Sequence, residues 1–345
     1  MINDKQENMI NDKQEKILEV KNLKTYFYTD GGIVKAVDGV NFDLKKGETL
    51  GIVGETGSGK SITALTILGL IPIPSGKIES GEIIFEGQDL LKFKINNLKH
   101  FRGNRISMIF QDPMTSLNPV FSIGNQIAEA ILAHQDITKK QAYSKTLDLL
   151  DMVGISDIKK RMKSYPHEFS GGMRQRAMIA MAIANSPSIL IADEPTTALD
   201  VTIQAQILEL IDTLKKKTNS SVILITHDLG VIAKYAERVM VMYAGKPVEF
   251  ATVDNIFYKP LHPYTLGLIG SVAKLNEEKK ERLKPIKGAP PSLIDLPIGC
   301  TFASRCRFAI KKCKIEFPPV IEEETSHFAS CYRAKEFIDG SLSRD

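Results

Sequence analysis

Residues 54–61 (GETGSGKS) match the pattern G-x-x-x-x-G-K-[ST], which is suited to holding phosphate groups. The apolar residues 50–53 before this loop predict a strand, and residues 61–70 after it predict a helix. Glycines let the loop curl until successive N–H groups point at phosphate oxygens, and the helix N-terminus adds positive potential. Lys60 would bridge the β- and γ-phosphates, and Ser61 would give its hydroxyl to Mg²⁺. The sequence therefore predicts a nucleoside triphosphate site formed by Gly54, Glu55, Thr56, Gly57, Ser58, Gly59, Lys60 and Ser61.

Two carboxylates, Asp193 and Glu194, follow the apolar run at residues 189–192. The carboxyl ends of parallel strands face the ligand crevice of an open α/β sheet. Asp193 would then hold Mg²⁺, and Glu194 would be the general base that polarises the attacking water. Alone, such a pair is usually a solvated turn, but a phosphate loop in the same chain favours a catalytic role. His227, directly after the run at residues 222–226, is a candidate contact to the γ-phosphate for the same reason.

Ser170, Gly171 and Gly172 precede residues 174–185, which predict a helix. Serine is a favoured helix cap, and the backbone N–H groups at a helix N-terminus form an anion site. The chain's own phosphate loop supplies no anion to this site. Seen alone, the pattern would also suit a simple helix cap.

Residues 169–175 (FSGGMRQ) resemble the signature sequence of ABC ATPases, and the order and spacing of these motifs over residues 17–272 resemble that family. The resemblance implies an α/β fold: an ABC-type P-loop nucleotide-binding domain with a RecA-like core, an antiparallel β subdomain and a helical subdomain at about residues 112–185. It implies ATP and Mg²⁺ as cofactors. It also implies that the signature of one subunit closes over ATP held by another subunit.

Further positions take roles from the same resemblance. Gln111 is similar to the catalytic-site glutamine that contacts Mg²⁺ and senses the transporter subunits. Asp200 ends an Ala-Leu-Asp sequence that is similar to the loop crossing the dimer interface. Phe27 is favoured as the ring that stacks on adenine, and the alternating pattern around it leaves Tyr26 and Tyr28 open.

Finer motifs resemble the ATP-binding subunits of dipeptide and oligopeptide importers, to which nickel and glutathione importers are similar. They are residues 111–119, 198–204 and 262–265, together with four cysteines near the C-terminus. The resemblance implies as partners two transmembrane permease subunits, a second ATPase subunit and, indirectly, an extracellular solute-binding protein. A heterodimer of ATPase subunits is favoured, and a homodimer stays open. The nature of the transported solute rests on this resemblance alone.

The four cysteines, Cys300, Cys306, Cys313 and Cys331, lie close together in a chain that has no other cysteine. None of them forms the C-x₂-C knuckle of a zinc ribbon or of a ferredoxin, so their spacing does not select a metal. Disulfides are not expected inside a cell, and unliganded thiols stay open. The resemblance implies a [4Fe–4S] cluster, with zinc as the second choice. We call residues 300–331, which contain the four cysteines, the cysteine segment. We expect ATP binding to be independent of it.

The 345-residue chain has an ordinary globular composition, with 43% hydrophobic residues, 25% charged residues and a net charge of +4. The small charge, the absence of Trp and the 7% aromatic content give no indication of nucleic acid binding. No apolar run approaches the roughly 18 residues of a membrane span, and the polar N-terminus does not resemble a signal peptide. We expect a peripheral protein at the cytoplasmic face of the cell membrane, held there by other subunits. A soluble ABC ATPase acting on DNA or ribosomes is disfavoured, because the chain has one set of motifs and no heptad run.

The elements that would position these residues alternate along the chain. Continuously apolar runs at residues 50–53, 189–192 and 222–225 are typical of a parallel sheet covered on both faces. Strands are predicted at residues 17–20, 34–43, 49–53, 81–85, 106–110, 188–192, 221–226 and 238–244. Helices are predicted at residues 61–70, 123–134, 139–153, 174–185, 201–218 and 229–235.

Three parts follow from these patterns: a flexible tail at residues 1–16, an ABC ATPase domain at 17–272 and a C-terminal peptide-importer extension at 273–345. The tail repeats MINDKQEN as MINDKQEK, so that either Met1 or Met9 suits a translation start. The extension begins with a charged, Pro-rich stretch and holds all four cysteines.

Overall fold

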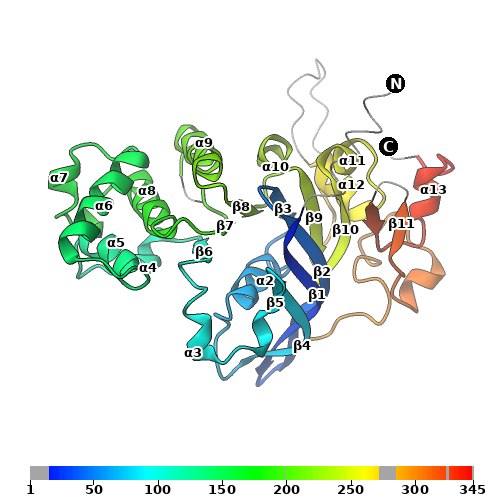
Figure 1. Cartoon of the computed structure of the whole chain (residues 1–345). Helices are drawn as coiled ribbons and strands as arrows, with labels where there is room; N and C mark the ends of the chain where they lie inside the picture. Colours follow the sequence, from blue (N-terminus) through cyan, green and yellow to red (C-terminus); the bar gives the residue numbers. More distant parts are fainter. Residues whose placement is uncertain (1–14, 198, 272–284, 324–325, 344–345) are drawn as a thin grey trace, which may run out of the picture. The chain divides into compact units, whose positions relative to one another are not determined.

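The structure is a computed structural model of the chain (Figure 1), and it describes residues 15–197, 199–271, 285–323 and 326–343. The N-terminal repeat, Ala198 and residues 272–284 of the predicted linker lie outside these residues. The described chain divides into two compact units. Unit 1 consists of Met1–Ile17, Leu44–Glu48 and Leu91–Ile225, and unit 2 consists of Leu18–Asp43, Thr49–Leu90 and Thr226–Asp345.

Unit 1 contains three parallel strands that are buried along their whole length. They are β6 (Ile106–Ile109), β7 (Ile189–Asp193) and β8 (Ser221–Ile225), with β7 in the middle. Side chains on both faces of such a strand avoid water, so its sequence is apolar throughout and does not alternate. The prediction of a parallel sheet covered on both faces is confirmed for these strands.

The helices of unit 1 include a group in which α5, α6 and α8 pack on one another and α4 and α7 join them, drawn in green in Figure 1. They occupy the stretch for which an inserted set of helices is predicted. The helices are α3 (Ile95–Leu98), α4 (Pro113–Ser116), α5 (Ile123–Leu132), α6 (Lys139–Met152), α7 (Ile158–Arg161), η2 (Pro166–Glu168), α8 (Gly171–Ala182) and α9 (Val201–Thr218). Within the described ranges, no helix of either unit combines the length and apolar character needed to span a membrane.

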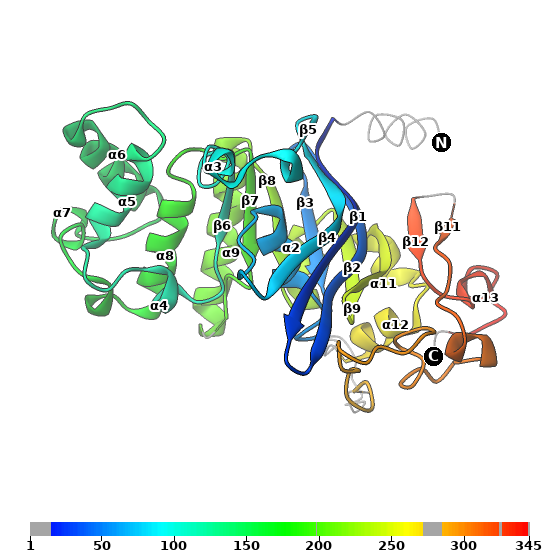
Figure 2. The same cartoon turned by 90° about the horizontal axis from the view of Figure 1, so that it is seen from below.

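Unit 2 contains a mixed sheet and a separate antiparallel sheet. In the mixed sheet β3 (Thr49–Val53) is parallel to β9 (Arg238–Tyr243), and β10 (Lys246–Thr252), β12 (His327–Ala329) and β11 (Ile321–Glu323) continue it in antiparallel fashion. The antiparallel sheet, blue to cyan in Figure 2, has the order β2-β1-β4-β5. Its strands are β1 (Lys16–Thr29), β2 (Gly32–Lys45), β4 (Gly76–Phe85) and β5 (Gln88–Asp89). The helices are α2 (Lys60–Ile67), η1 (Leu90–Lys92), α10 (Leu229–Tyr235), α11 (Val253–Tyr258), α12 (Pro263–Gly270), η3 (Lys311–Lys314) and α13 (Ala334–Ile338).

The predicted bounds are confirmed at β3, α9 and α10, and they differ where polar residues continue an element. The strand predicted at residues 17–20 runs to Thr29, because the exposed face of β1 carries polar side chains. The helix predicted from residue 174 begins at Gly171, directly after its Ser170 cap. Glycine has a low helix propensity, so the two glycines at the start did not predict a helix there. The Ser170 cap stabilises the helix start in spite of them.

The C-terminal residues continue the fold of unit 2. Strand β12 pairs with β10, and Phe337 of α13 shares a buried apolar cluster with Leu261 and Cys331. His327 Nε2 of β12 lies 2.6 Å from Glu249 Oε1 of β10, and both side chains are fully buried. The predicted extension is therefore attached to the sheet that also contains β3.

Candidate functional site: the phosphate loop and the acidic strand end

The loop between β3 and α2 has the backbone shape that the glycine pattern predicts. Gly54, Gly57 and Gly59 all have positive φ angles, of 152°, 79° and 102°. A Cβ atom on Gly54 would lie 2.2 Å from the Met242 carbonyl oxygen, and one on Gly59 would lie 2.3 Å from the Ala36 carbonyl oxygen. Since a non-bonded carbon and oxygen cannot approach so closely, only glycine fits these two positions.

The loop curls around the amine of Lys60, which opens helix α2. Lys60 Nζ is buried and donates to the carbonyl oxygens of Gly54 at 2.8 Å and Glu55 at 3.1 Å. The buried hydroxyl of Ser58 has no hydrogen-bond partner in the described part of the chain. A buried polar atom without a partner is costly, so this hydroxyl fits a site completed by a bound anion. Ser61 follows Lys60 in the first turn of α2.

Asp193 is the last residue of strand β7 in unit 1, and Glu194 follows it. Asp193 is buried, while Glu194 has a φ of 43°, an uncommon left-handed conformation for a residue other than glycine. The Glu194 N–H donates to the Ile225 carbonyl oxygen of β8 at 2.9 Å, which holds the turn in place. The strained turn sets the carboxylate beyond the strand end, where a general base would be needed.

The Glu194 carboxylate accepts two hydrogen bonds on the same oxygen. Gln111 Nε2 donates to Oε2 at 3.1 Å, and Thr197 Oγ1 donates to it at 3.1 Å. The structure therefore brings together two of the residues predicted for catalysis. Thr197 was missed by the sequence analysis, and its place three residues after Glu194 is the only signal that could have suggested it.

The signature residues lie at the start of helix α8, with Ser170 as its cap and Gly171 and Gly172 in its first turn. Ser170 Oγ accepts the Met173 N–H at 3.3 Å, and Asp200 caps the next helix, α9, by accepting the Ile203 N–H at 3.0 Å. A Cβ on Gly171 would lie 3.5 Å from the Leu199 side chain, so the two capped helix starts lie side by side. A Cβ on Gly172 would come within 3.1 Å of Ile203.

Two further predicted residues lie in unit 2. His227 is exposed directly before Asp228, whose carboxylate caps α10. Phe27 lies on β1 with its ring against Gly76, where a Cβ would be 2.9 Å from the ring. The hydroxyl groups of its two neighbours donate hydrogen bonds to carboxylates. The Tyr26 hydroxyl donates to Asp38 at 2.9 Å, and the Tyr28 hydroxyl donates to Glu79 at 2.8 Å.

The predicted residues thus divide between the units. Unit 2 holds the loop at residues 54–61, Phe27 and His227, and unit 1 holds Gln111, Ser170, Gly171, Gly172, Asp193, Glu194 and Asp200.

All four cysteines line one small cavity in unit 2, together with His262 and Phe302. Burial raises the pKa of the Cys300 thiol to about 11 and that of Cys331 to about 12, and Cys306 and Cys313 add to both shifts. Burial lowers the pKa of His262 to about 3, so this ring is neutral. In the part of the chain that the structure describes, no three Cys, His, Asp or Glu side chains are arranged to hold a metal ion.

The fold and these motifs define the class of the protein. A phosphate loop between a buried strand and a helix, an acidic strand end and a capped signature helix characterise the ATP-hydrolysing ABC ATPases.

Comparisons with known proteins agree. Residues 37–197 match the family described as "ABC transporter", and residues 248–313 match "Oligopeptide/dipeptide transporter, C-terminal region". The chain is 54% identical to the dipeptide transport ATP-binding protein DppD of Bacillus subtilis, over 91% of this chain and 94% of that protein. It is 53% identical to the oligopeptide transport ATP-binding protein OppD of the same organism, over 91% of this chain and 88% of that protein. The dimeric, post-hydrolysis structure of the ATP-binding cassette MJ0796 with ADP and Pi matches with a TM-score of 0.62 and 26% identity, over 68% of this chain and 98% of that one.

The chain therefore belongs to the ABC transporter family, among the ATP-binding proteins of oligopeptide and dipeptide transporters.

Proposed function

We propose that this ABC ATPase hydrolyses ATP to power the import of dipeptides or oligopeptides through partner permease subunits. One observation carries the peptide assignment: residues 248–313 match a region specific to oligopeptide and dipeptide transporters, in addition to the general ATPase match. Relatives more than 50% identical over nearly their whole length are named as peptide transport proteins. Nickel or glutathione import is the alternative, and these matches do not favour it.

In this proposal each residue has one task. The loop at residues 54–61, including Lys60, holds the phosphates, and Phe27 stacks on adenine. Ser61 and Asp193, with Gln111, would hold Mg²⁺, since hydroxyl, amide and carboxylate oxygens are the ligands it prefers. This ion would neutralise charge on the phosphates. Glu194, held by its strained turn, takes the proton of the attacking water.

His227 contacts the γ-phosphate in the same proposal. Ser170, Gly171, Gly172 and Asp200 serve the ATP of the other subunit, because the capped start of α8 presents N–H groups and a hydroxyl to an anion. Hydrolysis then requires a pair of ATPase subunits.

The proposed assembly has two transmembrane permease subunits and a second ATPase subunit, and a heterodimer is favoured over a homodimer. An extracellular solute-binding protein delivers the solute without contacting this chain. The protein lies peripherally on the cytoplasmic face of the membrane and binds no nucleic acid. The domain limits are those of the sequence: a tail at 1–16, the ATPase domain at 17–272 and the cysteine-containing domain at 273–345.

The test is purification of the tagged chain from solubilised membranes of its own cells. We expect two permease subunits and a second ATPase to purify with it. Reconstituted with the matching solute-binding protein, the complex should hydrolyse ATP several-fold faster with a peptide than without one. Stimulation by Ni²⁺ or glutathione, and not by peptides, would transfer the assignment to those importers. Recovery without any membrane subunit would contradict the transporter role.

We propose further that Cys300, Cys306, Cys313 and Cys331 hold a [4Fe–4S] cluster, with zinc as the second choice. Two observations support the proposal: the four thiols line one cavity, and cysteine thiolates are the usual ligands of such clusters. Because their pKa values are raised, the thiols of Cys300 and Cys331 are protonated without a metal and must lose their protons when the cluster binds. The negative charge of the resulting thiolates then needs compensation. The Arg333 N–H donates to Cys331 Sγ at 3.4 Å, and Arg333 and Arg307 partly offset the raised pKa of Cys306. The group would have a structural task, tying together a short segment.

Protein purified without oxygen is expected to be brown, with broad absorption near roughly 400 nm and about four irons per chain. Cys306→Ser should remove the colour and the iron, because it deletes one of four ligands. Ser304→Ala, an exposed change in the same segment, is the matched control and should keep both. Zinc without iron would reject the cluster and keep the four-ligand site, and protein without metal would leave four unliganded thiols.

A further inference from the structure

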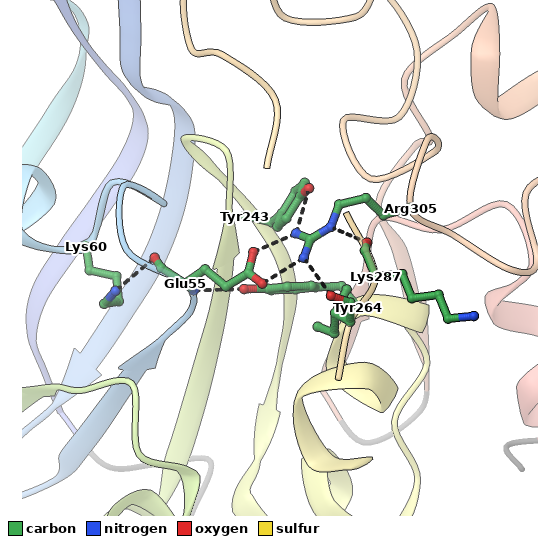
Figure 3. Close-up of polar contacts among 7 residues, drawn as sticks. Glu55, Lys60, Tyr243, Tyr264, Lys287 and Arg305 are labelled. Carbon is green, nitrogen blue, oxygen red and sulfur yellow. Dashed lines mark hydrogen bonds and ion pairs between the residues drawn. The ribbon is translucent and has the colours of Figure 1, made fainter. Parts of the chain in front are cut away.

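An ion pair joins the phosphate loop to the cysteine segment (Figure 3). Arg305 Nη1 lies 2.6 Å from Glu55 Oε2, and Arg305 Nη2 lies 2.9 Å from Glu55 Oε1. Two parallel bonds between a guanidinium and a carboxylate are the strongest and most directional form of an ion pair. The Arg305 side chain is only 4% exposed and that of Glu55 28%, so water screens this pair less than it screens a surface pair.

The Arg305 guanidinium is held from its other sides as well. Nε donates to the Lys287 carbonyl oxygen at 3.0 Å, and Nη1 donates to the Tyr243 hydroxyl at 3.2 Å. The group also lies 5.7 Å from the centre of the Tyr243 ring and 5.9 Å from that of Phe302. The hydrogen bond to Glu55 is the largest of the effects that raise the pKa of Arg305. Arg305 therefore offers the loop a charged group of fixed position and orientation.

Glu55 transmits this restraint to the phosphate-binding backbone. Its N–H donates to the Tyr264 hydroxyl at 2.8 Å, and its carbonyl oxygen accepts from Lys60 Nζ at 3.1 Å. The loop contains glycines with positive φ at positions 54, 57 and 59, whose backbones are freer than those of other residues. A side-chain anchor at residue 55 restricts that freedom at the point where the loop leaves β3. Glu55 therefore anchors the loop at two groups: its N–H donates to Tyr264, and its carboxylate binds Arg305.

We propose that Arg305 is a positioning residue for ATP: the cysteine segment holds the phosphate loop in its binding shape through Glu55. The proposal concerns the nucleotide site alone and is independent of the transported solute. It replaces the expectation that ATP binding does not depend on the cysteine segment. Arg305 directly precedes Cys306, so whatever orders the cysteines also orders the anchor of the loop.

The test separates binding from chemistry. Arg305→Ala should raise the Kd and KM for ATP about ten-fold, the usual order for losing a charged hydrogen-bonded pair. The kcat at saturating ATP should stay within about two-fold, because the residues of the acidic strand end are untouched. Arg305→Lys keeps the charge and loses the fork, so its Kd should fall between those of the wild type and Arg305→Ala.

A double-mutant cycle identifies the contact itself. Glu55→Gln should also weaken ATP binding, and Glu55→Gln combined with Arg305→Ala should be no weaker than Arg305→Ala alone. Lys311→Ala is the matched control: it removes an exposed positive charge of the same segment and should leave the Kd unchanged.

Unchanged ATP affinity in folded Arg305→Ala, or additive effects in the cycle, would overturn the proposal. If Arg305→Ala does not fold, Glu55→Gln decides, because it leaves the cysteine segment intact. Wild-type affinity in that variant would then overturn the proposal.

Discussion

Replacing Glu194 with Gln is expected to lower the kcat for ATP hydrolysis by about 100-fold or more, the range typical of losing a general base. The amide oxygen of Gln can accept the hydrogen bonds that Gln111 and Thr197 give to the carboxylate, so the shape of the site should survive. Only the basicity is lost. The Kd for ATP should stay close to that of the wild type, because the phosphate loop is unchanged. Steady-state hydrolysis and nucleotide titration measure the two quantities.

Glu86→Gln is a matched control for this change. Glu86 is an exposed glutamate with a φ of 48°, close to the 43° of Glu194, so both variants place glutamine in the same uncommon backbone conformation. Its kcat should be that of the wild type. Near-normal hydrolysis by Glu194→Gln would exclude Glu194 as the base. ATP-saturated Glu194→Gln protein, alone or with its partner ATPase, should also shift towards a dimer in light scattering, and a monomer in both cases would contradict the shared site.

Replacing Gly59 with Ala is expected to abolish measurable ATP binding, with a Kd raised by at least about 100-fold. The new Cβ would lie 2.3 Å from the Ala36 carbonyl oxygen, and this backbone atom belongs to strand β2, which cannot move aside freely. The φ of 102° adds strain of about 1 kcal/mol or more for any residue with a side chain. The loop must therefore leave its observed shape, and Lys60 must move with it. Isothermal titration with ATP measures the loss.

Gly87→Ala separates the strain of a positive φ from the steric clash of the new Cβ. Gly87 has a φ of 78° in the turn before β5, but an added Cβ would meet no atom within 4 Å. This variant should lose some stability and keep its ATP affinity. Wild-type affinity in Gly59→Ala would show that the loop can bind phosphate in another backbone shape.

Local chemistry explains which parts of the site could be predicted from sequence. The phosphate loop, the caps at Ser170 and Asp200, and the buried strands β3, β7 and β8 each depend on residues that are neighbours in the chain. Glycine, serine and continuous apolar runs restrict the backbone in the same way in any protein. The assignment of Gln111 came from family resemblance, and the structure places it against Glu194.

The rest depends on contacts between residues that are far apart in sequence. Arg305 and Glu55 are separated by 250 positions, and no periodicity links them. Tyr264 belongs to a motif that indicated only the subfamily, yet its hydroxyl binds the backbone of the phosphate loop. Strand β12 has three residues, too few to show a pattern, and it is a strand because β10 and β11 pair with it.

The pairing of β12 with β10 also has a consequence for biosynthesis. A ribosome makes the chain from its N-terminus, so the phosphate loop, β9 and β10 leave it long before His327. Until then, the nascent chain has an unpaired edge at β10, and Glu249 lacks its imidazole partner. Open strand edges are sites of aggregation in incomplete chains. Pairing with β12 (His327–Ala329), made near the end of synthesis, closes this edge of β10, so the edge is open to wrong pairing with other nascent copies until then.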